Sequence, residues 1–145
     1  MEPDLPAFFE TIVRNAADAI VYADNDGIIR FWNSGAARIF GYSQGEAVGR
    51  PLDIIIPERL RERHWHGYRQ VMQTGSSRYG AGDLLSVPGQ KKNGERVSLD
   101  FTIVPIRDAS SGRMRGMAAI LRDVTQRFNE IKALKDQLAA ARAKS

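Results

Sequence analysis

The sequence predicts an α+β domain in which a five-stranded antiparallel sheet carries helices on one face. Two observations predict this class: tight-turn signals separate neighbouring strand-like runs, and helix-like runs gather between the second and third of those strands. Strands joined by tight turns pair antiparallel, and helices placed between such strands collect on one side of the sheet. A helix-like segment at each end completes the predicted order.

The strands are recognised by β-rich runs bounded by turn residues. Asp26-Gly27 and Asn93-Gly94 supply tight turns, because glycine accepts the positive φ that such turns need. A further turn is predicted over 108–112. The five strands are predicted at 19–23, at 28–32, within 79–87, at 96–106 and at 114–122.

The helices inside the core are recognised by their end signals. Ser34 can cap a short helix at 35–40 that ends at Gly41. Ser43 and Glu46 have the spacing of a capping box. A longer amphipathic helix is predicted at 58–73, after Pro57.

The two ends of the chain are predicted to be helices outside the core, with parts at 1–17, 18–125 and 126–145. The lead-in helix groups four apolar residues on one side: Phe8, Phe9, Ile12 and Val13. The tail has apolar residues at coiled-coil spacing, namely Ile131, Leu134, Leu138 and Ala141. This seam is under two heptads long and is too short to hold a dimer by itself.

Composition narrows the classes of function. The chain has 145 residues, a net charge of +4 and no cysteine, which excludes disulfides, thiol catalysis and cysteine-linked cofactors. The basic residues are spread along the chain, so we expect no nucleic-acid partner, and Arg59, Arg61, Arg63 and Arg69 are interpreted as a solvated helix face. No apolar run is long enough to cross a bilayer and no secretory signal is visible, so we expect a cytoplasmic location and no membrane partner.

Several stretches, in this order and spacing, resemble the PAS family over about residues 8–126. They are Ala19-Ile20-Val21 with Asp26-Gly27-Ile28-Ile29, Trp32-Asn33-Ser34-Gly35-Ala36-Ala37, Phe40-Gly41-Tyr42-Ser43, Glu46-Ala47-Val48-Gly49-Arg50, Ile56-Pro57-Glu58-Arg59, Lys92-Asn93-Gly94-Glu95 and Ile120-Leu121-Arg122-Asp123-Val124-Thr125. The resemblance implies the PAS fold and a sensory function in bacterial-type signal transduction, not an enzyme. It also implies a homodimer and a downstream kinase, cyclase or regulator.

The resemblance further implies that the last strand passes its movement to the tail helix through Asp123 and Thr125. Asp123 and Gln126 have the spacing of a reciprocal cap, which would start that helix directly from the strand. The expected signalling element is therefore the junction at Asp123-Val124-Thr125.

The ligand is narrowed by what the chain lacks. Photoactive flavin members carry a cysteine soon after the segment that matches Gly49-Arg50, and here Pro51-Leu52 follows. The absence of cysteine excludes both the covalent flavin adduct and a thioester-linked coumaroyl pigment. An unidentified small molecule, haem and an empty core all remain compatible with the sequence.

Haem is the sharpest alternative. In haem-PAS oxygen sensors the iron-binding histidine lies seven residues after a proline that matches Pro57, which is the position of His64. Neutral imidazole is the usual proximal ligand of haem iron. The residues expected around such a ligand are His64, Tyr68, Leu84, Ile103 and Ile120. The competing interpretations are a structural His64 inside a PAS core and a ligand-free PAS dimerisation adaptor.

Overall fold

Five strands form one antiparallel sheet, as the sequence predicts, and their order in the sheet is β2-β1-β5-β4-β3. The computed structural model describes residues 4–76 and 82–144. The elements in chain order are α1 (Leu5–Asn15), β1 (Ala19–Asp24), β2 (Ile29–Trp32), α2 (Ser34–Phe40), α3 (Gln44–Ala47), the 3-10 helix η1 (Leu52–Ile55), α4 (Glu58–Thr74), β3 (Leu85–Gln90), β4 (Arg96–Arg107), β5 (Met114–Asp123) and α5 (Thr125–Lys144).

The hydrophobic core lies between one face of the sheet and the helices that follow β2. Side chains alternate along a strand, so only one face of each strand joins this core. Its strand members include Val21, Leu99 and Leu121, and Phe40 and Ile55 enter from α2 and η1. We call this side the inner face and the opposite side the outer face.

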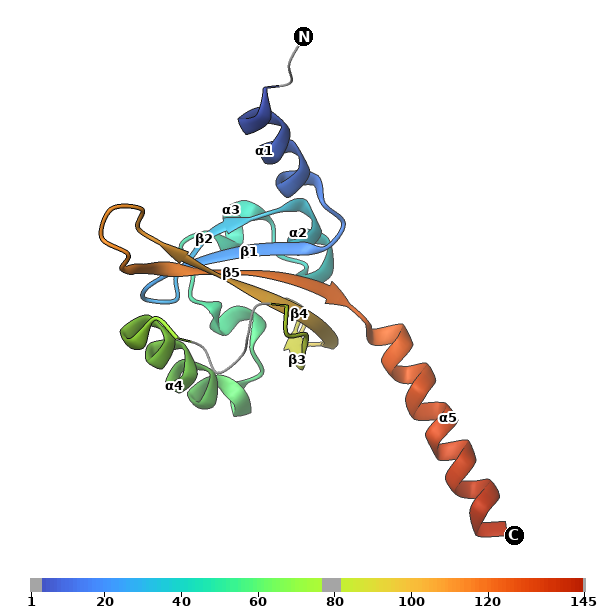
Figure 1. The fold of residues 1–145 in the computed structure, drawn as a ribbon. Helices are drawn as coiled ribbons and strands as arrows, with labels where there is room; N and C mark the ends of the chain where they lie inside the picture. The colour runs from blue at the N-terminus through green and yellow to red at the C-terminus, as the bar shows by residue number, and fades with distance from the viewer. Residues whose placement is uncertain (1–3, 77–81, 145) are drawn as a thin grey trace.

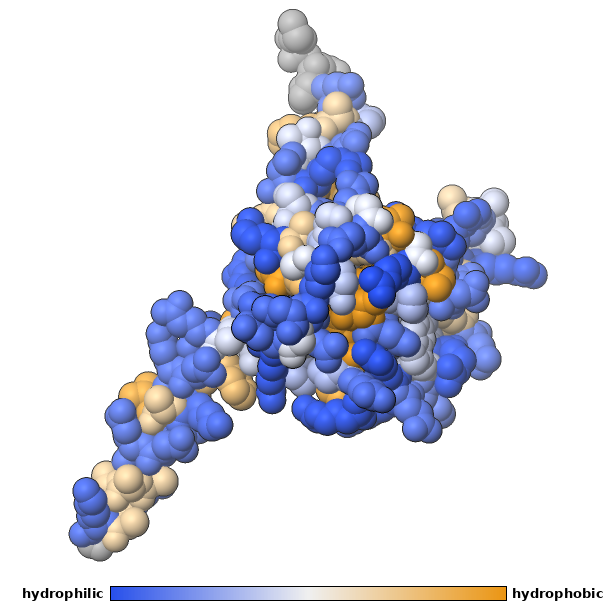
Figure 2. Space-filling model, turned by 180° about the vertical axis from the view of Figure 1, so that it is seen from behind, coloured by the Kyte–Doolittle hydropathy of each residue, from blue (hydrophilic) through white to orange (hydrophobic). Residues whose placement is uncertain are grey.

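The two terminal helices lie outside the core. Figure 1 shows α1 above the sheet and α4 below it, while α5 extends away from the body. Neither α1 nor α5 contains a buried residue in the described part of the chain. Large exposed apolar side chains lie on both helices, namely Leu5, Phe8, Phe9, Ile12, Phe128, Ile131, Leu134 and Leu138. The hydrophobic areas on both projecting helices are visible in Figure 2.

Local sequence signals account for most of the helix ends. Ser43 and Glu46 form the predicted capping box, with each side chain bonded to the other residue's backbone N–H. Gly41 and Gly75 end α2 and α4 in the left-handed conformation, where glycine is favoured. The cap of α2 differs from the prediction, because Asn33 caps it while the Ser34 hydroxyl donates to the Arg14 carbonyl.

The third strand lies further along the chain than predicted. We expected it within 79–87, and the structure has β3 at Leu85–Gln90; residues 79–81 lie outside the described part. Pro88 falls inside this strand and pairs with Ser98. Proline lacks the N–H that a second neighbour would need, and β3 is an edge strand with a partner on one side only.

Candidate functional site

Helix α4 presents an aromatic cluster toward the sheet. His64, Trp65 and Tyr68 lie on one side of the helix because residues three and four apart share a face. Their rings are mutually in contact, with centroids 4.8 Å apart for His64 and Trp65, 5.7 Å for His64 and Tyr68, and 5.6 Å for Trp65 and Tyr68. We call these three residues the α4 cluster.

Tyr68 fixes α4 to the first strand. Its side chain is buried, and its hydroxyl reaches two backbone carbonyls, those of Ala23 at 3.2 Å and Asp24 at 2.6 Å. Burial raises the pKa of this phenol, so the hydroxyl keeps its proton and remains a donor. Tyr68 therefore acts here as an anchor for the helix.

Trp65 makes the second attachment. Its indole N–H donates to Asp53 Oδ1 at 2.5 Å, which ties α4 to η1. The same ring covers Gly27, where an added Cβ would come within 2.1 Å of the indole. The glycine of the first hairpin thus serves both the turn, with φ of 76°, and the close approach of Trp65.

His64 is the one buried polar group of the cluster without a partner. Its side chain is mostly covered, and Nδ1 is buried with no hydrogen bond to any described residue. Burial lowers the pKa of this imidazole, and the charge of Asp53 opposes that shift only in part. His64 is consequently held neutral, and its Nδ1 is buried without a hydrogen-bond partner among the described residues.

The other predicted ligand-lining residues do not all meet at His64. Ile103 pairs with Ala119, which packs against the core, so Ile103 faces the inner side of the sheet. Ile120 pairs with Thr102 and Ile20, which places it on the outer face, 39% exposed. Leu84 precedes β3 and is 64% exposed. Alternation along a strand separates Ile120 from Ile103, because the residues are an odd number of pairs apart across the register.

The strand-to-helix junction is held by a short chain of hydrogen bonds. The Asp123 carboxylate accepts from the backbone N–H and the hydroxyl of Thr125, at 2.9 and 2.6 Å. The Thr125 hydroxyl oxygen in turn accepts from the backbone N–H of Ser98, at 3.0 Å. The start of α5 is therefore tied to both β5 and β4.

The predicted reciprocal cap at this junction is wrong in its second partner. Gln126 does not return a bond to Asp123; its amide donates to Glu130 one turn further along α5. The reason is that α5 begins at Thr125, one residue earlier than expected, which leaves Gln126 inside the helix. Thr125 supplies the second half of the junction instead.

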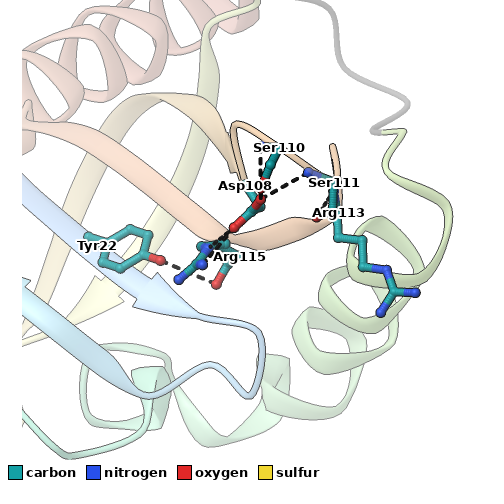
Figure 3. Close-up of polar contacts among 6 residues, drawn as sticks. All are labelled: Tyr22, Asp108, Ser110, Ser111, Arg113 and Arg115. Carbon is teal, nitrogen blue, oxygen red and sulfur yellow. Dashed lines mark hydrogen bonds and ion pairs between the residues drawn. The ribbon is translucent and has the colours of Figure 1, made fainter.

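The turn between β4 and β5 is organised by one carboxylate. In Figure 3 the Asp108 side chain accepts from Ser110, Ser111 and Arg115, while the Arg113 side chain points away from this group. The hydrogen bonds, with that from Arg115 the strongest, hold the pKa of Asp108 well below its usual range. These are bonds within a turn and indicate a structural role.

Neither a metal-binding cluster nor a membrane-spanning helix is found in the described part of the chain. In residues 4–76 and 82–144, no group of three or more His, Asp or Glu side chains is placed to hold a metal ion. Over the same ranges, no helix is both long and apolar enough to cross a membrane.

Comparison with known proteins decides the family. Residues 13–128 match the family model described as PAS fold. The chain belongs to the PAS family. Among solved structures, a PAS domain from Colwellia psychrerythraea superposes with a TM-score of 0.73 at 24% identity, over 85% of this chain and 99% of that one. An RNA-binding light-oxygen-voltage receptor gives 0.72 at 22% identity, over 97% of this chain and 39% of that one.

Two curated relatives of this PAS domain are named sensor proteins, and another is named a histidine kinase. Sensor protein FixL of Bradyrhizobium diazoefficiens is 27% identical over 128 residues, which is 88% of this chain and 25% of FixL. Oxygen sensor protein DosP of Escherichia coli is 26% identical over 113 residues, 78% of this chain and 14% of DosP. The cell-division control histidine kinase PdhS of Brucella ovis is 30% identical over 121 residues, 81% of this chain and 11% of PdhS. The chain thus spans a quarter or less of each of these relatives, and sensory PAS domains of this type are typical of bacterial signalling proteins.

Three residues of the site escaped sequence reasoning. Asp53, which holds Trp65, and Ser98, which holds Thr125, are distant in sequence from their partners. The third is Gly27, whose turn was predicted but whose contact with Trp65 was not. No local pattern identifies such pairs, because they depend on how α4 and β4 dock.

Proposed function

We propose that this PAS domain is the sensory unit of a bacterial signalling protein, and that it binds a small ligand beside His64 under α4. The observation that carries the proposal is the buried Nδ1 of His64, which has no hydrogen-bond partner among the described residues. A buried polar atom without a hydrogen-bond partner lowers the stability of the fold by about 1–3 kcal/mol. A ligand that bonds to this atom would offset the loss. Its neighbours Trp65 and Tyr68 already donate hydrogen bonds to Asp53 and to a backbone carbonyl, so His64 is the member of the α4 cluster left to bind a ligand.

Haem is the sharpest candidate for this ligand. FixL and DosP support it as relatives, since DosP is named an oxygen sensor, and His64 stands at the position of the iron-binding histidine in the haem-PAS resemblance. When bound, haem iron supplies a reversible site for a diatomic gas or for one electron. The chain would contribute His64 as the axial ligand, kept neutral by burial, and a helix whose position Tyr68 fixes.

The output of the sensor would pass through β5. Tyr68 contacts β1, β1 pairs with β5 along its length, and β5 ends at the Asp123–Thr125 junction from which α5 departs. A ligand that shifts α4 would alter this sheet and change the direction of α5. PdhS, a histidine kinase, supports a kinase as the downstream element, with a cyclase or another regulator as alternatives.

The experiment is an absorption spectrum of the purified protein before and after haem reconstitution, together with mass spectrometry of the extracted small molecules. Haem binding gives a Soret band, which His64→Ala should abolish and His66→Ala, on the exposed side of α4, should leave intact. A protein that stays colourless after reconstitution refutes haem. If in addition no small molecule is extracted, the ligand-binding proposal itself is wrong.

A second candidate, a ligand-free dimerisation adaptor, is favoured by the exposed apolar faces of α1 and α5. Four large apolar residues on each helix are about half exposed in the single chain, an arrangement that a homodimer would cover. Analytical ultracentrifugation of chains that lack residues 1–13 or 126–145 tests it. If both truncated chains dimerise with an unchanged dissociation constant, the helices do not carry the interface.

A further inference from the structure

The side of α4 that faces away from the sheet carries a stripe of cationic residues. At about 100° per residue, its members fall within an arc of about 120° centred opposite the buried Tyr68. The stripe lines a shallow hollow made by Arg59, Glu62, Arg63, His66 and Arg69. We call these five residues the α4 stripe.

Several arginines of the molecule are held by ion pairs or hydrogen bonds, whereas within the described residues the three arginines of the stripe are not. Five ion pairs are present in residues 4–76 and 82–144, and they engage Arg14, Arg30, Lys92, Arg115 and Arg122. Arg61, on the same helix, turns back to donate to the Ile56 carbonyl. Within those same ranges Arg59, Arg63 and Arg69 make no ion pair and their side chains are directed to solvent.

The residues of the α4 stripe favour one of two polyanionic partners, a nucleic acid or an acidic protein helix. A nucleic acid presents phosphate at every step and favours exposed aromatic rings for its bases. Glu62 would repel that backbone, and the aromatic rings of α4 face inward, where Trp65 and Tyr68 are hydrogen-bonded to the core. A protein helix with spaced acidic residues fits better, because one basic residue on it can pair with Glu62.

We propose that the α4 stripe is a docking surface for an acidic helical segment of a partner protein. From Arg59 to Arg69 the stripe is about 15 Å long, which matches three turns of a partner helix. The surface is small, so the contact is weak and sensitive to salt. His64 lies on the opposite side of the same helix, so the docked partner would be separated from the sensor position by the width of α4; docking itself does not depend on a ligand at His64.

The probe is a fluorescent synthetic peptide of alanine and glutamate, with glutamate at every third or fourth position, compared with the same peptide carrying glutamine. Binding to the whole chain is followed by anisotropy at about 0.05 M and about 0.5 M salt. The test variant is Arg63→Glu/Arg69→Glu. Its control, Lys132→Glu/Lys135→Glu, makes the same change of charge on exposed positions of α5. Thermal melts establish that both variants are folded.

The acidic peptide should bind, and the glutamine peptide should not. Binding of the acidic peptide should weaken at least about tenfold in the α4 variant and at high salt, and should be unchanged in the α5 variant. Glu62→Gln should strengthen the binding about twofold to threefold, since it removes the one anion of the stripe. An equal loss in both charge-reversal variants, or no binding at all, overturns the proposal. Tighter binding of polyuridylate than of the peptide overturns the choice of partner.

Discussion

Replacing Asn33 by alanine should destabilise the domain by about 3 kcal/mol, more than its size suggests. This buried side chain makes four hydrogen bonds: Oδ1 accepts from the backbone N–H groups of Ile20 and Ala36, and Nδ2 donates to the carbonyls of Val13 and Asp18. Loss of the helix cap costs about 1 kcal/mol, and the partly buried Ile20 N–H left unpaired costs a further 1–3 kcal/mol or so. The carbonyls of Val13 and Asp18 add less, because an under-satisfied carbonyl is tolerated better than an unpaired N–H.

Urea unfolding followed by circular dichroism measures this change, and at about 2–4 °C per kcal/mol the melting temperature should fall by roughly 6–12 °C. Ser34→Ala is the matched control, because it deletes one exposed bond to the Arg14 carbonyl and should cost about 0.5 kcal/mol or less. If Asn33→Ala costs no more than Ser34→Ala, the four bonds do not act as described.

Three other predictions follow from contacts described above. Tyr68→Phe should lower the free energy of unfolding by about 1–2 kcal/mol in urea titrations, and Tyr22→Phe, whose hydroxyl bond is exposed, by clearly less; equal losses would contradict the anchoring role. The hydrogen-bonded ion pair with Lys92 lowers the pKa of Glu46 to about 2, below the ordinary 4.5. The contribution of this pair to the free energy of unfolding is therefore complete above pH 4.5 or so and disappears as the pH falls toward 2. Glu46→Gln should therefore melt at a lower temperature than the parent at neutral pH and at the same temperature near pH 2, a difference that high salt should reduce. Thr125→Val should speed hydrogen exchange at the Ser98 amide and in the first turn of α5; unchanged exchange at both places would show that the junction does not hold them together.

The sequence predicted the features that are settled over a few residues. The Ser43 and Glu46 capping box, the glycine end of α2 and the turn at Gly27 depend on neighbours within one turn of chain, and the structure confirms each. The order of the strands along the chain and their antiparallel hairpins followed from the same local turns, whereas the position of β1 between β2 and β5 was not predicted.

The features that sequence reasoning missed depend on contacts between distant residues. Ser98 and Thr125 are 27 positions apart, and Asn33 rather than Ser34 caps α2 because only Asn33 points inward to meet β1 and α1. Ile120 faces outward because of the β4–β5 register. The sequence does not reveal this register, because apolar residues occur on both faces of these strands. The unpaired nitrogen of His64 likewise becomes visible only when the helix is docked.

The two ends of strand β5 are attached to different parts of the molecule. Near its start Gly116 pairs with Asp24, the residue whose carbonyl holds Tyr68, and an added Cβ there would lie 2.0 Å from the Ala23 oxygen, so this end is clamped. Its far end, seven residues away or about 23 Å, is the foot of α5. Because β5 is hydrogen-bonded to β1 on one side and to β4 on the other, a displacement at its clamped end would be shared with both neighbours before it reached the foot of α5.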